Sequence, residues 1–240
     1  EAATARLRHP SGGVASGFHM VLHLVHGHRR PRCPTFTGAA VTGARRPDTL
    51  SVLVTAAHCL NSAQEAEDAW VTFDHVCDEA HVTWHRLDPV LLFGRDELSD
   101  IAVCAFKTVL SSVPSLSYHP SVLPLQAYLD SYSNERIYVV HHASRHGVKG
   151  IRRGHVSMVS SAVLFHTAST HGGCSGAPIV HERSHAVIGV VTATNALAAG
   201  GRYVDVNEGY FLRPTMDALL LHGYVVTMRP SALRRGDVGT

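Results

Sequence analysis

The chain has 240 residues, of which 45% are hydrophobic, enough for a substantial core in one large domain or two small ones. A formal net charge of +2 and the absence of a long apolar stretch argue against a nucleic-acid partner and against membrane insertion. The 19 histidines are dispersed and the five cysteines show no C-x-x-C spacing, so we expect a soluble protein without a metal or cofactor.

The first half of the chain is predicted to be β-structure. Residues 1–17 are polar and contain several glycines, which is typical of a loosely held N-terminal arm. Short apolar or alternating runs then predict six strands, at 18–25, 35–41, 50–56, 70–76, 80–87 and 101–108. Six short strands in this span suit one small barrel or sandwich, which we place at 18–109.

The second half repeats this pattern after a break. Residues 110–125 are rich in Ser and Pro and predict a linker. Six further strands are expected, at 136–141, 153–159, 162–166, 177–181, 186–192 and 202–206. A Pro followed by Leu-rich residues predicts a short helix at about 214–222, which completes a second unit at 126–228. A basic tail, 229–240, follows.

The stretch His171-Gly-Gly-Cys-Ser-Gly-Ala-Pro178 surrounds one hydroxyl with small residues. Glycine permits the positive φ angles that let Ser175 stand out of a tight turn, with the N–H groups of Gly173 and Ser175 free to bind an oxyanion. Alone, such a turn is equally typical of a surface hairpin. A base and an acid elsewhere in the chain decide between these interpretations.

Two further motifs supply that base and acid. Thr-Ala-Ala-His58-Cys follows an apolar run, and Ser-Asp100-Ile-Ala-Val begins another, so the order along the chain is His58, Asp100, Ser175. With these motifs the chain resembles the chymotrypsin-fold serine proteases from about residue 35 to residue 221. The details around Ser175 are most similar to the bacterial glutamyl endopeptidases and other trypsin-like peptidases of that kind.

The resemblance implies an all-β fold of two six-stranded antiparallel β-barrels, with a short C-terminal helix, and a serine endopeptidase acting on protein or peptide substrates. It implies that Ser175 is the nucleophile, His58 the general base and acid, and Asp100 the residue that orients His58. Gly173 and Ser175 would supply the oxyanion N–H groups. Asp96 competes for the acid role, but Asp100 is favoured because an apolar run that would bury it follows directly.

The resemblance also locates the specificity pocket. Its implied residues are uncharged: Ser169, Thr170, Thr192, Ala193 and Thr194. Glutamyl enzymes place a His on the wall strand, where Val191 stands here, so an acidic preference is not implied and a small or medium uncharged P1 residue is expected. In many relatives the Cys beside the catalytic His forms a disulfide with the preceding strand. By resemblance Thr37 occupies that place, which leaves Cys33 as the candidate partner of Cys59.

Two other functions stay open at this point. The chain contains His181-Glu-x-x-His185, the zinc metallopeptidase pattern, although that pattern needs a helix and this segment is predicted to be a hairpin turn. A chymotrypsin-like fold can also act as a catalytically silent binding or structural subunit, with the terminal segments as candidate docking sites for a protein partner. A start at Glu1 suggests that a targeting segment was removed, and hence a secreted or organelle-lumen location.

Overall fold

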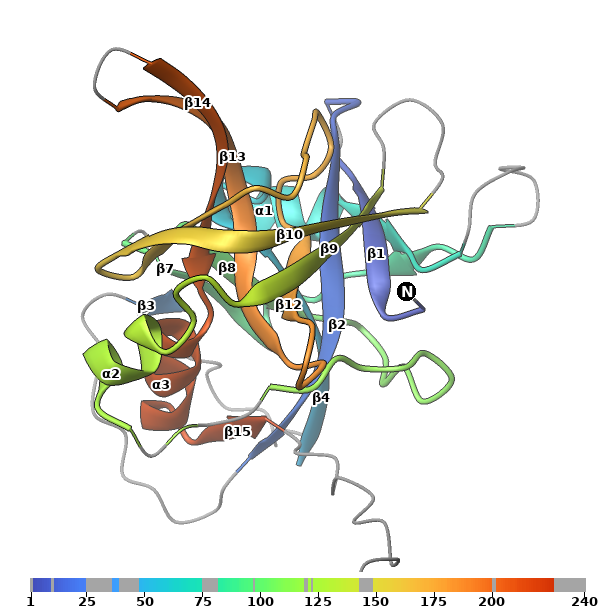
Figure 1. Cartoon of the computed structure of the whole chain (residues 1–240). Helices are drawn as coiled ribbons and strands as arrows, with labels where there is room; N and C mark the ends of the chain where they lie inside the picture. Colours follow the sequence, from blue (N-terminus) through green and yellow to red (C-terminus); the bar gives the residue numbers. More distant parts are fainter. Residues whose placement is uncertain are drawn as a thin grey trace, which may run out of the picture.

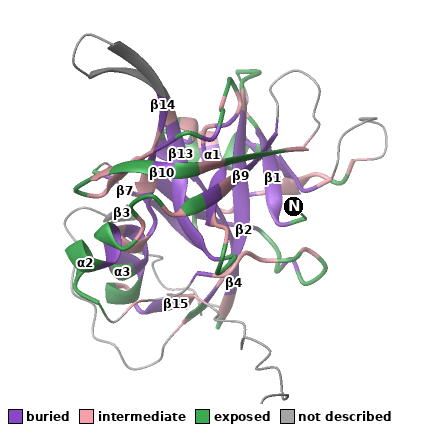
Figure 2. Cartoon of the chain, viewed as in Figure 1, coloured by how far each residue is buried: buried purple, intermediate pink, exposed green. Residues whose placement is uncertain are grey.

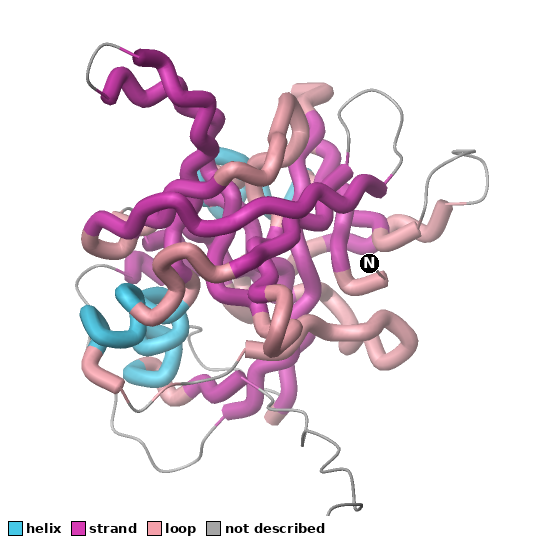
Figure 3. Tube along the Cα trace, viewed as in Figure 1, coloured by secondary structure: helices cyan, strands magenta, loops and turns pink. Residues whose placement is uncertain are grey.

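The computed structural model describes residues 2–9, 11–24, 36–38, 48–74, 82–96, 98–118, 121, 123–142, 149–199 and 202–226. Strands dominate these residues and form two antiparallel sheets that pack against each other (Figures 1 and 3). The predicted all-β class is therefore confirmed.

The first sheet holds nine strands within the described residues, in the order β3-β7-β8-β4-β2-β1-β5-β6, with β15 also pairing with β2. The strands are β1 (Thr4–Arg8), β2 (Val14–Leu24), β3 (Phe36–Gly38), β4 (Thr49–Ala56), β5 (Trp70–Thr72), β6 (His85–Arg86), β7 (Phe93–Asp96), β8 (Ile101–Ala105) and β15 (Tyr224–Val226). As described, this sheet is an open half-barrel whose two ends, β3 and β6, do not pair.

The N-terminal segment belongs to this sheet. Residues 1–17 were expected to form a loose arm, but β1 pairs with β2 on one side and with β5 on the other. The side chains of Ala5 and Leu7 are buried, which holds the segment in place. The sequence interpretation was wrong here because residues 1–17 are largely polar. Only the pairing with neighbouring strands shows that they form β-structure joined by a Gly turn.

The strand before His58 pairs with a strand that is distant in sequence. β4 pairs with β2, and the described part of the predicted strand 35–41 is β3, which pairs with β7. These segments are all β-prone, and only tertiary packing selects which of them become neighbours.

The second sheet closes into a six-stranded barrel in the order β10-β11-β14-β13-β12-β9. Its strands are β9 (Arg136–His142), β10 (Lys149–Ser160), β11 (Val163–His166), β12 (Pro178–His181), β13 (Val187–Ala199) and β14 (Arg202–Phe211). Much of β10 faces outward and is exposed, whereas β12 is largely buried (Figure 2). The barrel interior is apolar and includes Ile137, Leu164 and Phe211.

A single apolar cluster joins the two sheets. It contains Phe18 and Met20 from β2, Val187 and Val190 from β13, and Leu212, which follows β14. Each fully buried side chain of this size contributes about 1.5–3 kcal/mol. The cluster therefore fixes the junction between the sheets, which is where the predicted catalytic residues meet.

The helices are short: η1 (Ala57–Cys59), α1 (Ala63–Asp68), α2 (Leu125–Asp130) and α3 (Arg213–Leu221). The last corresponds to the helix predicted at 214–222, with Pro214 in its first turn. After α3 the chain returns to the first sheet as β15. Within the described residues no helix combines the length and apolar character needed to span a bilayer. The predicted basic tail, 229–240, lies outside the described residues.

Candidate active site

His58 and Asp100 are brought together by strand pairing in the first sheet. The β4–β8 register places Ala56 opposite Ile101, so the residues just beyond these two positions are neighbours. His58 Nδ1 donates to Asp100 Oδ2 at 2.7 Å, and the His58 backbone N–H donates to Oδ1 at 2.9 Å. This pairing with Asp100, helped by the Cys59 side chain, raises the pKa of His58 to about 10.

Asp100 is held by its own backbone. Its φ of 44° lies in the left-handed region, which Asp tolerates better than most residues, and its carbonyl accepts the Ala57 N–H at 2.8 Å. The competing Asp96 has another partner: its Oδ1 accepts the Leu98 N–H at 3.1 Å and so stabilises the turn before Asp100. Of the two acids, Asp100 is the one that contacts His58.

Ser175 lies in a tight turn between β11 and β12. The Cys174 N–H donates to the His171 carbonyl at 3.0 Å, and Gly173 and Gly176 adopt φ angles of 94° and 85°. In the described part of the chain, the N–H groups of Gly173 and Ser175 donate to no protein acceptor. The turn therefore leaves both predicted oxyanion donors unoccupied.

Ser16, on β2, connects this turn to the first sheet. Its Oγ donates to the Gly173 carbonyl at 2.7 Å and accepts the His142 N–H at 3.0 Å, while its own N–H donates to the Ser175 carbonyl at 2.8 Å. The Ser16 carbonyl in turn accepts the Thr55 hydroxyl at 2.7 Å. Sequence reasoning missed Ser16, because it belongs to a segment that was interpreted as an arm.

His58 and Ser175 line the same open cleft, which has a volume of about 330 Å³. The other lining residues are Leu7, His9, Ser11, Gly13, Val14, Ala15, Cys59 and Asn61. No hydrogen bond joins the Ser175 hydroxyl to His58 in this structure. Such bonds are often long without substrate and tighten when it binds.

The predicted pocket residues lie on two neighbouring segments. Thr170 donates to Asn207 Oδ1 at 2.6 Å, and Asn207 Nδ2 donates to the Ala168 carbonyl at 2.7 Å. The backbone of Thr194 pairs with that of Asn207 in the β13–β14 ladder. The side chain of Thr194 lies outside the described part of the structure. Asn207 was not predicted. Counting residue pairs along the β13–β14 hairpin, from the predicted wall residue Thr194 across to β14, would have identified it.

The remaining predicted pocket residues are less engaged. Ser169 is exposed and Ala193 is half-buried. Thr192 is buried, and its hydroxyl lies 3.5 Å from the Glu208 carbonyl. All five predicted pocket residues have uncharged side chains.

The His181-Glu-x-x-His185 segment is a hairpin turn and not a helix. His181 closes β12 and donates through Nε2 to Glu135 at 3.0 Å, while its Nδ1 lies 2.9 Å from the Ser184 hydroxyl. His185 lies near Tyr138 instead, with 3.4 Å between Nδ1 and the phenol oxygen. The two imidazoles therefore have separate partners, which is the opposite of the metallopeptidase arrangement.

The described cysteines are free thiols: Cys59, Cys104 and Cys174. The pairing of Cys59 with Cys33 is thus not formed; Cys33 and Cys77 lie outside the described residues. Ala15 of β2 lines the cleft together with Cys59, and the Thr37 side chain lies outside the described part of the structure.

Solved protease structures share this architecture. Deg5 superposes with a TM-score of 0.56 at 14% identity, over 92% of this chain and 90% of its own. The inactive form of the Rv3671c protease gives a TM-score of 0.52 at 12% identity, over 92% of this chain and 88% of its own. An inactive mutant of Rv3671c from M. tuberculosis gives 0.53 at 12% identity, over 91% and 85%. At these identities the likeness establishes the fold.

The family follows from the sequence itself. A comparison with curated protein sequences gives no match. The family model for the trypsin-like peptidase domain, however, matches residues 37–190, which is well over half of the chain and includes His58, Asp100 and Ser175. The chain therefore belongs to the trypsin-like peptidase family.

Proposed function

We propose that the protein is a serine endopeptidase in which Ser175 is the nucleophile, His58 the general base and acid, and Asp100 the residue that orients His58. One observation carries this proposal: His58, which makes two hydrogen bonds with Asp100, lines the same cleft as Ser175. A hydrogen bond from His58 Nδ1 to Asp100 leaves Nε2 as the basic nitrogen, which is the tautomer that a serine nucleophile requires.

The reaction then proceeds in two balanced halves. The Ser175 oxygen attacks the peptide carbonyl while its proton passes to His58, and the N–H groups of Gly173 and Ser175 stabilise the oxyanion. His58 next gives that proton to the departing amine, which leaves an ester on Ser175. Water then attacks this ester while its proton passes to His58, and His58 returns the proton to the Ser175 oxygen as the ester bond breaks and the carboxylic acid product leaves.

The pocket residues support a preference for small or medium, uncharged P1 side chains. The Asn207 amide, which accepts from Thr170 and donates to the Ala168 carbonyl, is uncharged. A basic P1 side chain would find no carboxylate partner among Ser169, Thr170 and Thr192. Closeness to the glutamyl endopeptidases gains no support from Val191, which is buried and apolar.

Labelling with a fluorophosphonate probe tests the proposal directly. The probe esterifies activated serines, so we expect stoichiometric labelling of the folded parent and none of the Ser175→Ala variant. Ser184→Ala is a matched control, because Ser184 is an exposed turn serine near His181. Labelling that persists in Ser175→Ala would contradict the assignment of the nucleophile.

Ser175 and His58 are not hydrogen-bonded to each other in this structure. This observation favours testing a second function, that of a catalytically silent binding subunit. Folded parent protein that resists the probe at every pH up to 10 would favour this function. The terminal segments would then be examined for a protein partner.

A further inference from the structure

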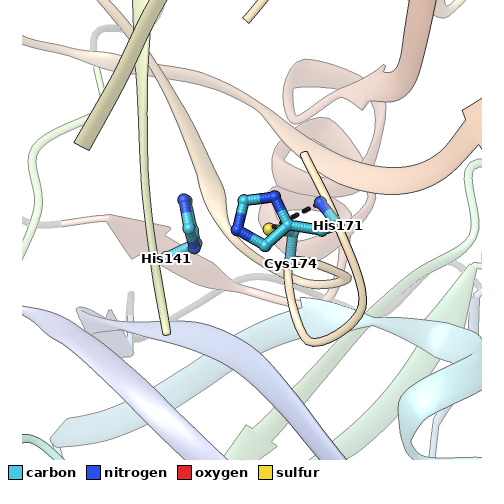
Figure 4. A group of neighbouring side chains, drawn as sticks. All are labelled: His141, His171 and Cys174. Atoms are coloured by element: carbon cyan, nitrogen blue, oxygen red, sulfur yellow. Dashed lines mark hydrogen bonds between the residues drawn. The ribbon is translucent and has the colours of Figure 1, made fainter. Parts of the chain in front are cut away.

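Three potential metal ligands converge behind the Ser175 turn (Figure 4). His141 comes from the end of β9, and His171 and Cys174 come from the turn itself. One ligand atom from each residue lies within 4.8 Å of the other two. The two imidazole rings are 5.1 Å apart between centroids and stand at 81° to each other. In the described part of the chain, no other group of three His, Cys, Asp or Glu side chains is brought this close.

His141 is the unusual member of the cluster. Its side chain is only 1% exposed, yet neither ring nitrogen has a hydrogen-bond partner. Buried polar groups almost always have partners, so an orphaned imidazole calls for an explanation. Burial, together with the charges of His171 and Arg152, lowers the pKa of His141 to about 4. The ring is therefore neutral at physiological pH and has a lone pair available for a ligand.

Cys174 supplies a thiol of a different kind from a reactive surface cysteine. It is buried, and the His171 N–H donates to its Sγ at 3.3 Å. Burial raises the pKa of the thiol, whereas this N–H and the Arg152 guanidinium lower it. The His171 N–H is therefore already placed to stabilise a thiolate at Cys174.

We propose that His141, His171 and Cys174 bind a zinc ion. Two imidazoles and one thiolate match the ligand preference of Zn²⁺, and a water completes the tetrahedron. Ligand bonds of about 2.0–2.3 Å place the ligand atoms about 3.5 Å apart in such a site. Closing the cluster from its present spacing, in which the ligand atoms lie within 4.8 Å of one another, thus takes a shift of about 1 Å in the turn or in β9. Binding releases the Cys174 proton as the sulfur–zinc bond forms.

Zinc at this site would act on the oxyanion turn. Cys174 stands between Gly173 and Ser175, and coordination would tie the turn to β9 through His141. A movement of about 1 Å in a catalytic group costs about 100-fold in rate. We therefore expect zinc to inhibit the enzyme reversibly; this consequence rests on the proposed function, whereas the binding itself does not.

Cobalt titration of the full chain tests the site without reference to activity. Co²⁺ replaces Zn²⁺ in tetrahedral sites and gives a thiolate charge-transfer band. We expect one such band, abolished by added zinc and by Cys174→Ala, and at least about tenfold weaker binding in His171→Ala, since loss of a ligand costs no less than loss of its supporting partners. His171 is exposed, so this variant should fold. His155→Ala, an exposed β10 histidine, is the matched control and should bind like the parent.

Three outcomes would overturn the proposal: no band in folded parent, unchanged binding in His171→Ala, or loss of the band in Cys59→Ala, which would place the ligand thiol beside His58. Fluorophosphonate labelling with and without zinc then separates the two proposals. A cobalt band in a protein that never labels supports the metal site and contradicts the protease. Labelling unaffected by zinc in protein that shows the band would contradict the inhibitory role.

Discussion

The two sheets differ in how their buried histidines are hydrogen-bonded. In the first sheet, His19 donates through Nδ1 to the Pro114 carbonyl at 3.1 Å, and only its Nε2 has no hydrogen-bond partner. In the closed barrel, His141 and His166 are both buried, and neither nitrogen of either ring has a hydrogen-bond partner. The buried histidine of the first sheet is thus held by one hydrogen bond, whereas these two barrel histidines are held by none.

The proposed catalytic residues follow the same division. Asp100 fixes His58 through two bonds made within the first sheet. The barrel contributes the Ser175 turn, whose oxyanion donors are open and which is held from outside by Ser16. The acid–base half of the site, His58 and Asp100, is therefore preformed. The nucleophile half, which is the Ser175 turn, depends on contact between the two sheets. This difference makes separate predictions for each half and for the link between them.

Breaking the pair in the first sheet should have the largest effect. Asp100→Asn keeps the shape of the side chain but favours the wrong His58 tautomer, so kcat/KM on a peptide substrate should fall about 10⁴-fold. Since the Asp100 carboxylate raises the pKa of His58 to about 10, and the base must be neutral, activity of the parent should rise with pH into the alkaline range. In the variant, the rising limb should move toward 6.5, the ordinary histidine pKa.

The parallel substitution Asp96→Asn is the control. Within the described residues, the Asp96 side chain accepts one hydrogen bond, from the Leu98 N–H in its own turn, so its loss should leave the pH of the rising limb unchanged. An Asp100→Asn profile with the same rising limb as the parent would show that the carboxylate does not control His58.

The preformed half was also the more predictable one from sequence. His58 follows one apolar run and Asp100 precedes another. When two such strands pair in antiparallel fashion, the end of the first and the start of the second lie side by side. The Ser175 turn was recognisable because glycine is needed at Gly173 and Gly176, both of which adopt positive φ.

The contacts between sheets could not be predicted in this way. Ser16 and His141 act on the Ser175 turn from positions far along the chain, and apolar periodicity indicates a strand without naming its partner. For the same reason the sequence could not show that β4 pairs with β2, or that the β13–β14 register brings Asn207 to Thr170.

The barrel's open histidines predict a loss of stability in acid. Burial lowers the pKa of His166 from 6.5 to about 4, an effect that the nearby Ala168 carbonyl offsets only in part. The unfolded chain therefore binds a proton between these pH values that the folded chain does not, and stability falls as pH drops through this window. The contribution of this residue amounts to about 3 kcal/mol. Urea unfolding at pH 7 and pH 4 measures it.

His166→Phe removes the titrating group and should reduce the pH dependence of the unfolding free energy by about that amount. His155→Phe, on the exposed strand β10, should leave the dependence as it is in the parent. A parent and a His166→Phe variant with equal pH dependence would mean that His166 takes up a proton in the folded state.

Removing the Ser16 hydroxyl, which links the first sheet to the Ser175 turn, should have the smallest effect. It tests whether the position of this turn depends on the first sheet. Ser16→Ala leaves the Gly173 carbonyl and the His142 N–H without their shared partner, at a cost to stability of about 1–3 kcal/mol. The turn can then shift, so kcat should fall about 10- to 100-fold while KM changes little, because the oxyanion forms only after substrate has bound. Ser16→Thr keeps the hydroxyl and should recover most of the rate. A purely structural role for Ser16 would lower stability in the Ala variant and leave kcat of the folded fraction at the parent value.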